Sequence, residues 1–116
     1  MGCPVVHFEV AGKNGKKLQD FYATLFDWNI TVDPEMNYGV VETGGDGGIN
    51  GGVFQAPPDA PAYLTFYVAV DDLQAYLDKA ERLGGKTVVA PTPIPNIGAF
   101  AMFTDPEGNL VGLFKG

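Results

Sequence analysis

The stretch GAFAMFTDPEGNLVGLFKG, residues 98–116, decides the fold, because it aligns without a gap on YGVVETGGDGGINGGVFQA, residues 38–56. Matched positions lie 60 residues apart and include Gly48 with Gly108, Gly52 with Gly112 and Phe54 with Phe114. Each copy has the pattern of a strand, a Gly/Asp-rich turn and a second strand. Two such units predict a sheet with approximate two-fold symmetry that encloses one central cleft.

Composition limits the class of protein. A length of 116 residues with 46% hydrophobic residues predicts a single globular domain. A net charge of −7, with only seven basic residues, argues against nucleic acid as a partner. Cys3 is the single cysteine, so no disulfide can form within the chain, and the sequence shows no signal peptide or apolar run of membrane length. We therefore expect a cytoplasmic protein without a membrane partner.

The first half predicts one strand, one helix and three further strands. Residues 5–11 alternate, with His7 and Glu9 on one face and Phe8 and Val10 on the other. Asn14 begins a helix whose predicted apolar stripe is Leu18, Phe21, Tyr22 and Leu25. Strands are predicted over residues 28–32, 38–43 and 50–55.

The second half repeats this order. A Pro-rich connector at 57–62 separates module one, residues 1–56, from module two, residues 63–116. Module two predicts a strand at 63–70, a helix that begins at Asp71 or Asp72 and ends at Gly84-Gly85, a strand at 86–90, a proline-rich loop at 91–97, and strands at 98–104 and 109–114. The predicted apolar face of that helix consists of Leu73, Tyr76, Leu77, Ala80 and Leu83. The predicted class is α+β, with two tandem βαβββ modules forming a curved mixed sheet around a central cleft.

Four motifs in this order suggest a family. They are His7-Phe8-Glu9-Val10, FYATLFDW at 21–28, VDDL at 70–73 and TDPEGN at 104–109. Over essentially the whole chain the sequence resembles the vicinal oxygen chelate superfamily, which includes glyoxalase I, bleomycin resistance proteins, ring-cleaving dioxygenases and methylmalonyl-CoA epimerase. Residues 84–86, 93–98 and 112–114 are similar to a glyoxalase-like branch without an assigned chemistry.

The resemblance implies a metal site in metal-dependent members, with one ligand on the first and one on the last strand of each module. The ion chelates vicinal oxygens as a Lewis acid or activates dioxygen. Carried over to this chain, the four positions are His7, Gly52, Thr65 and Gly112. Threonine is a poor ligand and glycine offers no side chain.

A shifted register does not restore the metal site. Shifts that preserve the strand face offer neither an imidazole nor a carboxylate, since they bring in Tyr63 or Tyr67, Asn50 or Phe54, and Leu110 or Phe114. His7 is the only histidine, so a 2-His-1-carboxylate site within one subunit is excluded. We expect neither a divalent metal nor another cofactor.

Each candidate residue has a functional and a structural interpretation. His7 is either a catalytic group or a remnant that hydrogen-bonds a partner such as Glu9. Glu9 is either a general base with a raised pKa or half of an ordinary ion pair. Tyr38, Tyr63 and Tyr67 either line a ligand pocket or pack. Gly52 and Gly112 either make room for a ligand or mark bends in the sheet.

Three classes of function follow. The favoured one is a module that binds a small organic molecule in the cleft, through His7, Tyr38, Gly52, Tyr63, Thr65, Tyr67 and Gly112. The alternative is a lyase, isomerase or dioxygenase of the superfamily that uses a divalent metal, or His7 or Glu9 as general base. An interaction module without a ligand is the third. The resemblance also implies a homodimer.

Overall fold

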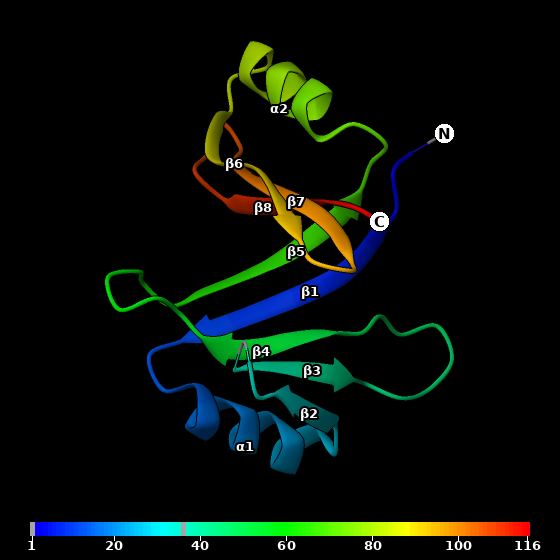
Figure 1. Cartoon of the computed structure of the whole chain (residues 1–116), viewed down its shortest axis with the longest axis vertical. Helices are drawn as coiled ribbons and strands as arrows, with labels where there is room; N and C mark the ends of the chain where they lie inside the picture. The colour runs from blue at the N-terminus through cyan, green and yellow to red at the C-terminus, as the bar shows by residue number, and fades with distance from the viewer. Residues whose placement is uncertain (1, 36) are drawn as a thin grey trace. The chain divides into compact units, whose positions relative to one another are not determined.

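The computed structural model describes residues 2–35 and 37–116. Its elements are β1 (Val5–Gly12), α1 (Gly15–Phe26), β2 (Asn29–Asp33), β3 (Tyr38–Glu42), β4 (Gly51–Gln55), β5 (Tyr63–Ala69), α2 (Leu73–Arg82), β6 (Lys86–Ile94), β7 (Gly98–Thr104) and β8 (Leu110–Lys115) (Figure 1). This order is βαβββ twice, which confirms the predicted α+β class. The chain forms two compact units, one of residues 7–64 and one of residues 65–116 with the N-terminal stretch through Val6. The predicted module limits, 1–56 and 63–116 with a connector at 57–62, stay a prediction.

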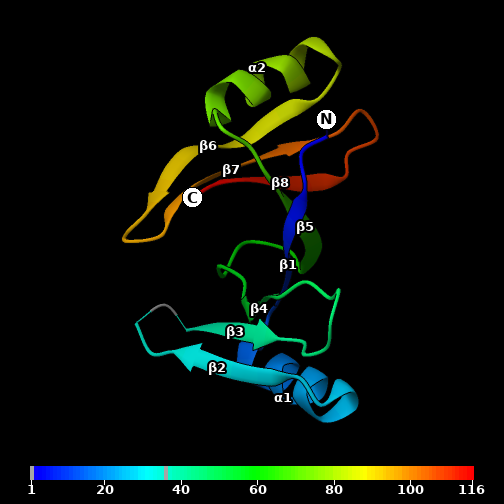
Figure 2. The same ribbon diagram turned by 90° about the vertical axis from the view of Figure 1, so that its right-hand side faces the viewer.

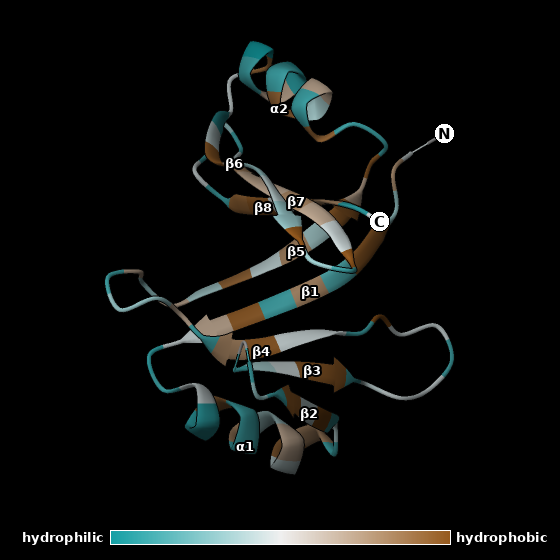
Figure 3. Cartoon of the chain, viewed as in Figure 1, coloured by the Kyte–Doolittle hydropathy of each residue, from teal (hydrophilic) through white to brown (hydrophobic). Residues whose placement is uncertain are grey.

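The 7–64 unit has a mixed sheet in the strand order β2-β3-β4-β1. Strand β1 runs parallel to β4, while β2 pairs with β3 and β3 with β4 in the antiparallel sense. Its core contains the buried side chains of Val10, Val41 and Val53, against which Phe8 and Tyr22 pack. Because neighbouring strand residues point to opposite faces, His7 and Glu9 lie on the face away from this core. The hydropathy of β1 alternates accordingly (Figure 3).

Helix α1 begins as predicted but presents a different face to the sheet. Its N-cap is Asn14, whose Oδ1 accepts a hydrogen bond from the Lys17 backbone N–H at 3.1 Å. The predicted stripe is wrong in part, because Phe21 and Leu25 are 55% and 57% exposed. The helix instead packs on the sheet through Gly15, Leu18, Gln19 and Tyr22. This face keeps Leu18 and Tyr22 of the predicted stripe and has Gly15 and Gln19 in place of the other two residues.

The 65–116 unit has the strand order β5-β8-β7-β6, with β5 parallel to β8 and the other pairs antiparallel. Helix α2 packs on this sheet (Figure 2). Its Leu73 and Leu77 contact Ala101 and Leu113 in the core. Of the two predicted caps, Asp72 is the N-cap and accepts a hydrogen bond from the Ala75 N–H at 3.0 Å. The predicted apolar face extends one residue too far as a buried surface, because Leu83 follows the helix as C-cap and is 70% exposed although it lies on the same side as Tyr76 and Ala80.

Strand β6 is longer than predicted. The sequence predicts a loop from residue 91, but the strand continues through Pro91 and Pro93 to Ile94. Proline removes a backbone donor and is therefore confined to edge strands and bulges. Strand β6 is the last in its sheet order, and its pairing with β7 shifts register between Thr87 and Val89 and again between Val89 and Thr92. These two features accommodate the prolines.

Within the described residues, neither helix is long and apolar enough to cross a membrane.

Candidate functional site

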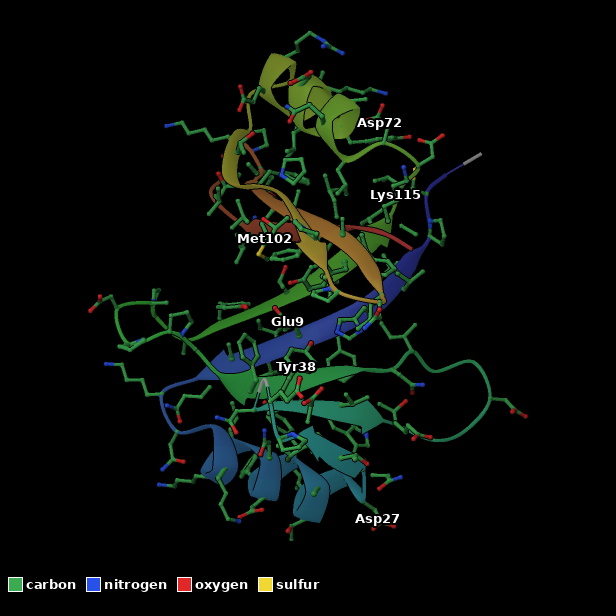
Figure 4. The ribbon with its side chains drawn as sticks, viewed as in Figure 1. Glu9, Asp27, Tyr38, Asp72, Met102 and Lys115 are labelled. Atoms are coloured by element: carbon green, nitrogen blue, oxygen red, sulfur yellow. The ribbon has the colours of Figure 1, made fainter. Side chains whose placement is uncertain are left out.

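Four side chains of the 7–64 unit form a hydrogen-bonded group, which we call the Glu9 cluster: His7, Glu9, Tyr38 and Tyr63. Glu9 is only 6% exposed, and its Oε1 accepts a hydrogen bond from the Tyr63 hydroxyl at 2.7 Å. Its Oε2 accepts one from the Tyr38 hydroxyl at 2.8 Å (Figure 4). Both carboxylate oxygens of a buried charge are thus hydrogen-bonded, as burial of a charge requires.

His7 joins the cluster through Tyr38. Its Nε2 lies 2.8 Å from the Tyr38 hydroxyl oxygen. Because the Tyr38 proton is directed at Glu9, His7 must donate, which assigns the Nε2–H tautomer. The Tyr38 hydroxyl therefore connects His7 to Glu9, the partner that the sequence suggests for this histidine. Through these two hydrogen bonds, the protonation of His7 and the charge of Glu9 influence each other.

Burial and the carboxylate set the protonation of the cluster. Burial lowers the pKa of His7 below its ordinary 6.5, and the nearby Glu9 charge opposes this only in part. Burial also raises the pKa of Tyr63 above its ordinary 10.0, reinforced by the hydrogen bond to Glu9 and by the Glu9 charge. Near neutral pH the imidazole is therefore uncharged and the Tyr63 phenol keeps its proton.

Aromatic rings surround this charge. Phe54 on β4 lies between two members of the cluster, with its ring centroid 5.1 Å from that of Tyr38 and 6.3 Å from that of Tyr63. His7 stacks on Tyr38 at 6.3 Å. Phe54 was absent from the predicted ligand-binding residues. Its position two residues after Gly52, on the same strand face, is the sequence signal that places it here.

Gly52 is the partner of Glu9 in the β1–β4 register. A Cβ built at Gly52 would coincide with the Tyr38 ring and hydroxyl. Tyr38 comes from the neighbouring strand β3, where Val40 rather than Tyr38 is paired with Gly52. Residue 52 must therefore be glycine for the Tyr38 ring to fit beside the Glu9 carboxylate.

The 65–116 unit has a corresponding pair. Tyr67 is the register partner of Gly112 between parallel strands, as Glu9 is of Gly52, and a Cβ at Gly112 would coincide with the Tyr67 ring. By the same register, Thr65 stands where His7 stands in the first module. The Thr65 hydroxyl donates to the Leu110 carbonyl at 2.6 Å.

The predicted site residues are thus divided between the two units. His7, Glu9, Tyr38, Gly52 and Tyr63 come together in the 7–64 unit. Thr65, Tyr67 and Gly112 lie in the 65–116 unit.

Comparison with known proteins decides the family. The model of the Glyoxalase/Bleomycin resistance protein/Dioxygenase superfamily matches residues 5–113. The chain belongs to this superfamily. It is 35% identical over 87 residues to CFP32 of Mycobacterium tuberculosis, whose name describes it as a glyoxylase, and covers 33% of that protein with 75% of its own length. It is 28% identical over 124 residues to the anthracycline biosynthesis protein DnrV of Streptomyces peucetius, with 93% of this chain matching 45% of DnrV.

The chain thus spans between a third and a half of the length of these relatives. Among solved structures, the hypothetical protein BH1468 from Bacillus halodurans aligns with a TM-score of 0.72 at 12% identity, over 100% of this chain and 96% of that one. This likeness confirms the fold.

The residues of this superfamily member do not fit the divalent ion that the family implies. Gly52 and Gly112 have no donor atom, and tyrosine rings occupy the space beside them. The Thr65 hydroxyl already donates to the Leu110 backbone carbonyl, and Nε2 of His7 is hydrogen-bonded to the Tyr38 hydroxyl. Among the described residues, no group of three or more His, Cys, Asp and Glu side chains could hold an ion.

Proposed function

We propose that this chain binds a small organic molecule against the Glu9 cluster, and that the metal chemistry of its superfamily is not carried out there. The observation that supports the proposal is the placement of Tyr38, which takes the space beside Gly52 and hydrogen-bonds both Glu9 and His7. Half-buried aromatic rings around a few convergent polar groups are typical of small-molecule sites.

The chemistry of the cluster favours an aromatic molecule that carries a protonated amine. Tyrosine and phenylalanine faces attract cations, and the negative charge of Glu9 lies at the hydroxyl ends of Tyr38 and Tyr63. The net charge of −7 also draws cations toward the protein. An anthracycline with an amino sugar has both features, and the name of DnrV makes it a natural first ligand to test.

Fluorescence titration tests this proposal. We expect the amino-sugar anthracycline to bind more tightly than its aglycone, and Phe54→Ala to weaken binding at least about fivefold. The matched control is Phe66→Ala on β5, an exposed aromatic residue outside the cluster, which should leave binding unchanged. If the aglycone binds equally well, the protonated amine is not recognised and that part of the proposal is wrong. The absence of saturable binding, or an equal loss in both variants, would overturn it.

Metal content provides a separate test. We expect protein purified without chelator to contain no stoichiometric zinc, nickel, iron or manganese. Stoichiometric metal that is lost in His7→Ala would contradict the proposal, because it would place an ion at the family position.

One observation favours an enzyme as second candidate. His7 is uncharged near neutral pH and is linked through Tyr38 to a carboxylate, so it could act as a metal-free general base. A glyoxalase assay, chosen from the name of CFP32, should then show turnover that survives chelator and is lost in His7→Gln. Turnover that depends on added metal would point to the metal-dependent alternative instead.

We also propose that the chain forms a homodimer. Helix α1 exposes Phe21, Leu25 and Phe26 at 53–57%, and clustered exposed apolar side chains mark interaction surfaces. A second copy is the occupant we infer, because two-fold self-association is the commonest oligomeric arrangement. Sedimentation velocity should give a dimer for the wild type and a monomer for Phe21→Ser/Leu25→Ser. A dimer in both would place the interface elsewhere.

A further inference from the structure

A hollow lies in the 65–116 unit, between helix α2 and the sheet. We call it the α2 groove; its volume is about 370 Å³, within the range of small-molecule sites. Its floor includes Val68 and Leu113. Because neighbouring strand residues point to opposite faces, this floor is the reverse side of the sheet from Tyr67 and Gly112. The groove is therefore distinct from the family positions of this unit.

One wall of the groove is a row along α2. Tyr76, Lys79, Ala80 and the C-cap residue Leu83 follow the spacing i, i+3, i+4 and i+7, which places them on one helix face. At about 1.5 Å per residue this row is about 10 Å long. The wall and floor are mostly aliphatic and aromatic. Such an elongated apolar groove suits an unbranched alkyl chain.

The polar groups of the groove indicate the charge of its ligand. Among the residues that the structure describes, Lys79 is the only charged one that lines it, in a protein whose net charge is −7. The other polar contact is at Cys3, whose Sγ lies 3.3 Å from the Tyr76 hydroxyl. None of the described carboxylates lines the groove. Lys79 therefore provides a local cation for an anionic head group, with the apolar row beside it for a tail.

We propose that the α2 groove binds a medium-chain carboxylate. Its alkyl chain lies along Tyr76, Ala80 and Leu83, and its carboxylate pairs with Lys79. The pairing is exposed and hence weak, so chain length provides most of the affinity. Each added methylene should tighten binding about fourfold, whereas loss of the Lys79 charge should weaken it about two- to fivefold at low salt.

The experiment is an NMR titration of the full chain with hexanoate, octanoate, octanol and octylamine. We expect octanoate to bind more tightly than hexanoate, with shifts centred on Val68, Leu113 and α2, and octylamine to bind more weakly than octanol. Lys79→Gln should remove the advantage of octanoate over octanol, while the control Lys13→Gln, an exposed lysine of the other unit, should keep it. Leu83→Asp, at an exposed position, should weaken octanoate binding more than Lys79→Gln does, because it removes an apolar contact to the alkyl chain and adds a like charge.

Alkylation of Cys3 gives an independent readout, because it is the only cysteine of the chain and is exposed at the groove. Saturating octanoate should slow the alkylation rate, and octylamine should not. Octylamine binding as well as octanoate, shifts outside the 65–116 unit, or an unchanged alkylation rate at saturation would each overturn the proposal.

Discussion

The ring of Tyr38 fills the space that a side chain on Gly52 would need, and its hydroxyl donates to Glu9, the register partner of that glycine. The lack of a side chain at Gly52 on β4 thus makes room for the large side chain of Tyr38 on β3. The two residues act as one unit, because a change in either alters the position of a hydrogen-bond donor to a buried carboxylate. This dependence can be measured.

Gly52→Ala should destabilise the protein by about 2–4 kcal/mol. The new methyl group overlaps the Tyr38 ring, which must move and give up its hydrogen bonds to Glu9 and His7. Urea unfolding measures the loss. The control Gly2→Ala adds a methyl group where nothing lies within 4 Å and should change stability by less than about 0.5 kcal/mol.

A double-mutant cycle identifies the cause. With Tyr38→Ala already present, Gly52→Ala should cost less by at least about 1 kcal/mol, because the ring with which it collides is gone. Additive effects would mean that the methyl group at residue 52 meets some other obstacle, and the interpretation of this pair as one unit would be wrong.

Tyr63→Phe should destabilise the protein by about 1–3 kcal/mol, since one oxygen of the buried Glu9 carboxylate loses a 2.7 Å hydrogen bond. Chemical denaturation measures the change. Tyr22→Phe is the matched control, because the Tyr22 ring stacks on Trp28 at 5.5 Å and keeps that contact without its hydroxyl. A cost no greater than that of the control would show that water replaces the Tyr63 donor freely.

The same variant tests the raised pKa of Tyr63. In an ultraviolet titration of the five tyrosines, the Tyr63 phenol should ionise above its ordinary range, and Tyr63→Phe should remove this step from the late part of the curve. Because the folded protein retains this proton more strongly than the unfolded chain, the phenol contributes stability below pH 10 that is lost as the pH rises further. Loss of an early step instead would contradict the assignment.

The sequence predicts those features that depend on residues close together along the chain. Strand alternation placed His7 and Glu9 on one face, and the short polar residues Asn14 and Asp72 marked the starts of both helices, because capping depends on only a few neighbouring residues. The repeat predicted the order of elements for the same reason.

Features that depend on packing between distant segments were missed. The contact of Tyr38 with Gly52 depends on how β3 slides against β4, and one sequence does not specify this register. The face that α1 presents to the sheet was predicted wrongly because its aromatic residues suggest an apolar stripe. The close approach is instead set at Gly15, where an added Cβ would lie only 2.8 Å from the Gln55 backbone nitrogen. The prolines of β6 predict a loop, whereas an edge strand tolerates them, and the local sequence does not show that β6 lies at the edge of its sheet.

The buried Gln19 was also missed, and it leads to a further prediction. Its Nε2 donates to the Val53 carbonyl at 2.8 Å, and the residue is only 8% exposed. Gln19→Leu should destabilise the protein by about 1–3 kcal/mol despite the added hydrophobicity, because a buried acceptor loses its donor. Gln74→Leu is the control on α2, since the Gln74 amide donates to the exposed Asp78 carboxylate at 2.9 Å, and should cost less than about 0.5 kcal/mol. A stabilising Gln19→Leu would show that packing outweighs the hydrogen bond.

His7 should give the folded state a pH dependence of known sign. Its pKa in the folded protein lies below the ordinary 6.5, so the folded state binds fewer protons than the unfolded chain between these two values, and stability falls as the pH drops through this window. The free energy of unfolding of the wild type should therefore decrease more steeply below about pH 6.5 than that of His7→Gln, and the two curves should run parallel above it. The chain has one histidine, so its imidazole NMR titration is unambiguous and should show a midpoint below 6.5. A midpoint above 6.5, with the wild type gaining stability relative to the variant at low pH, would mean that the Glu9 charge outweighs burial and that His7 is a cation in the folded protein.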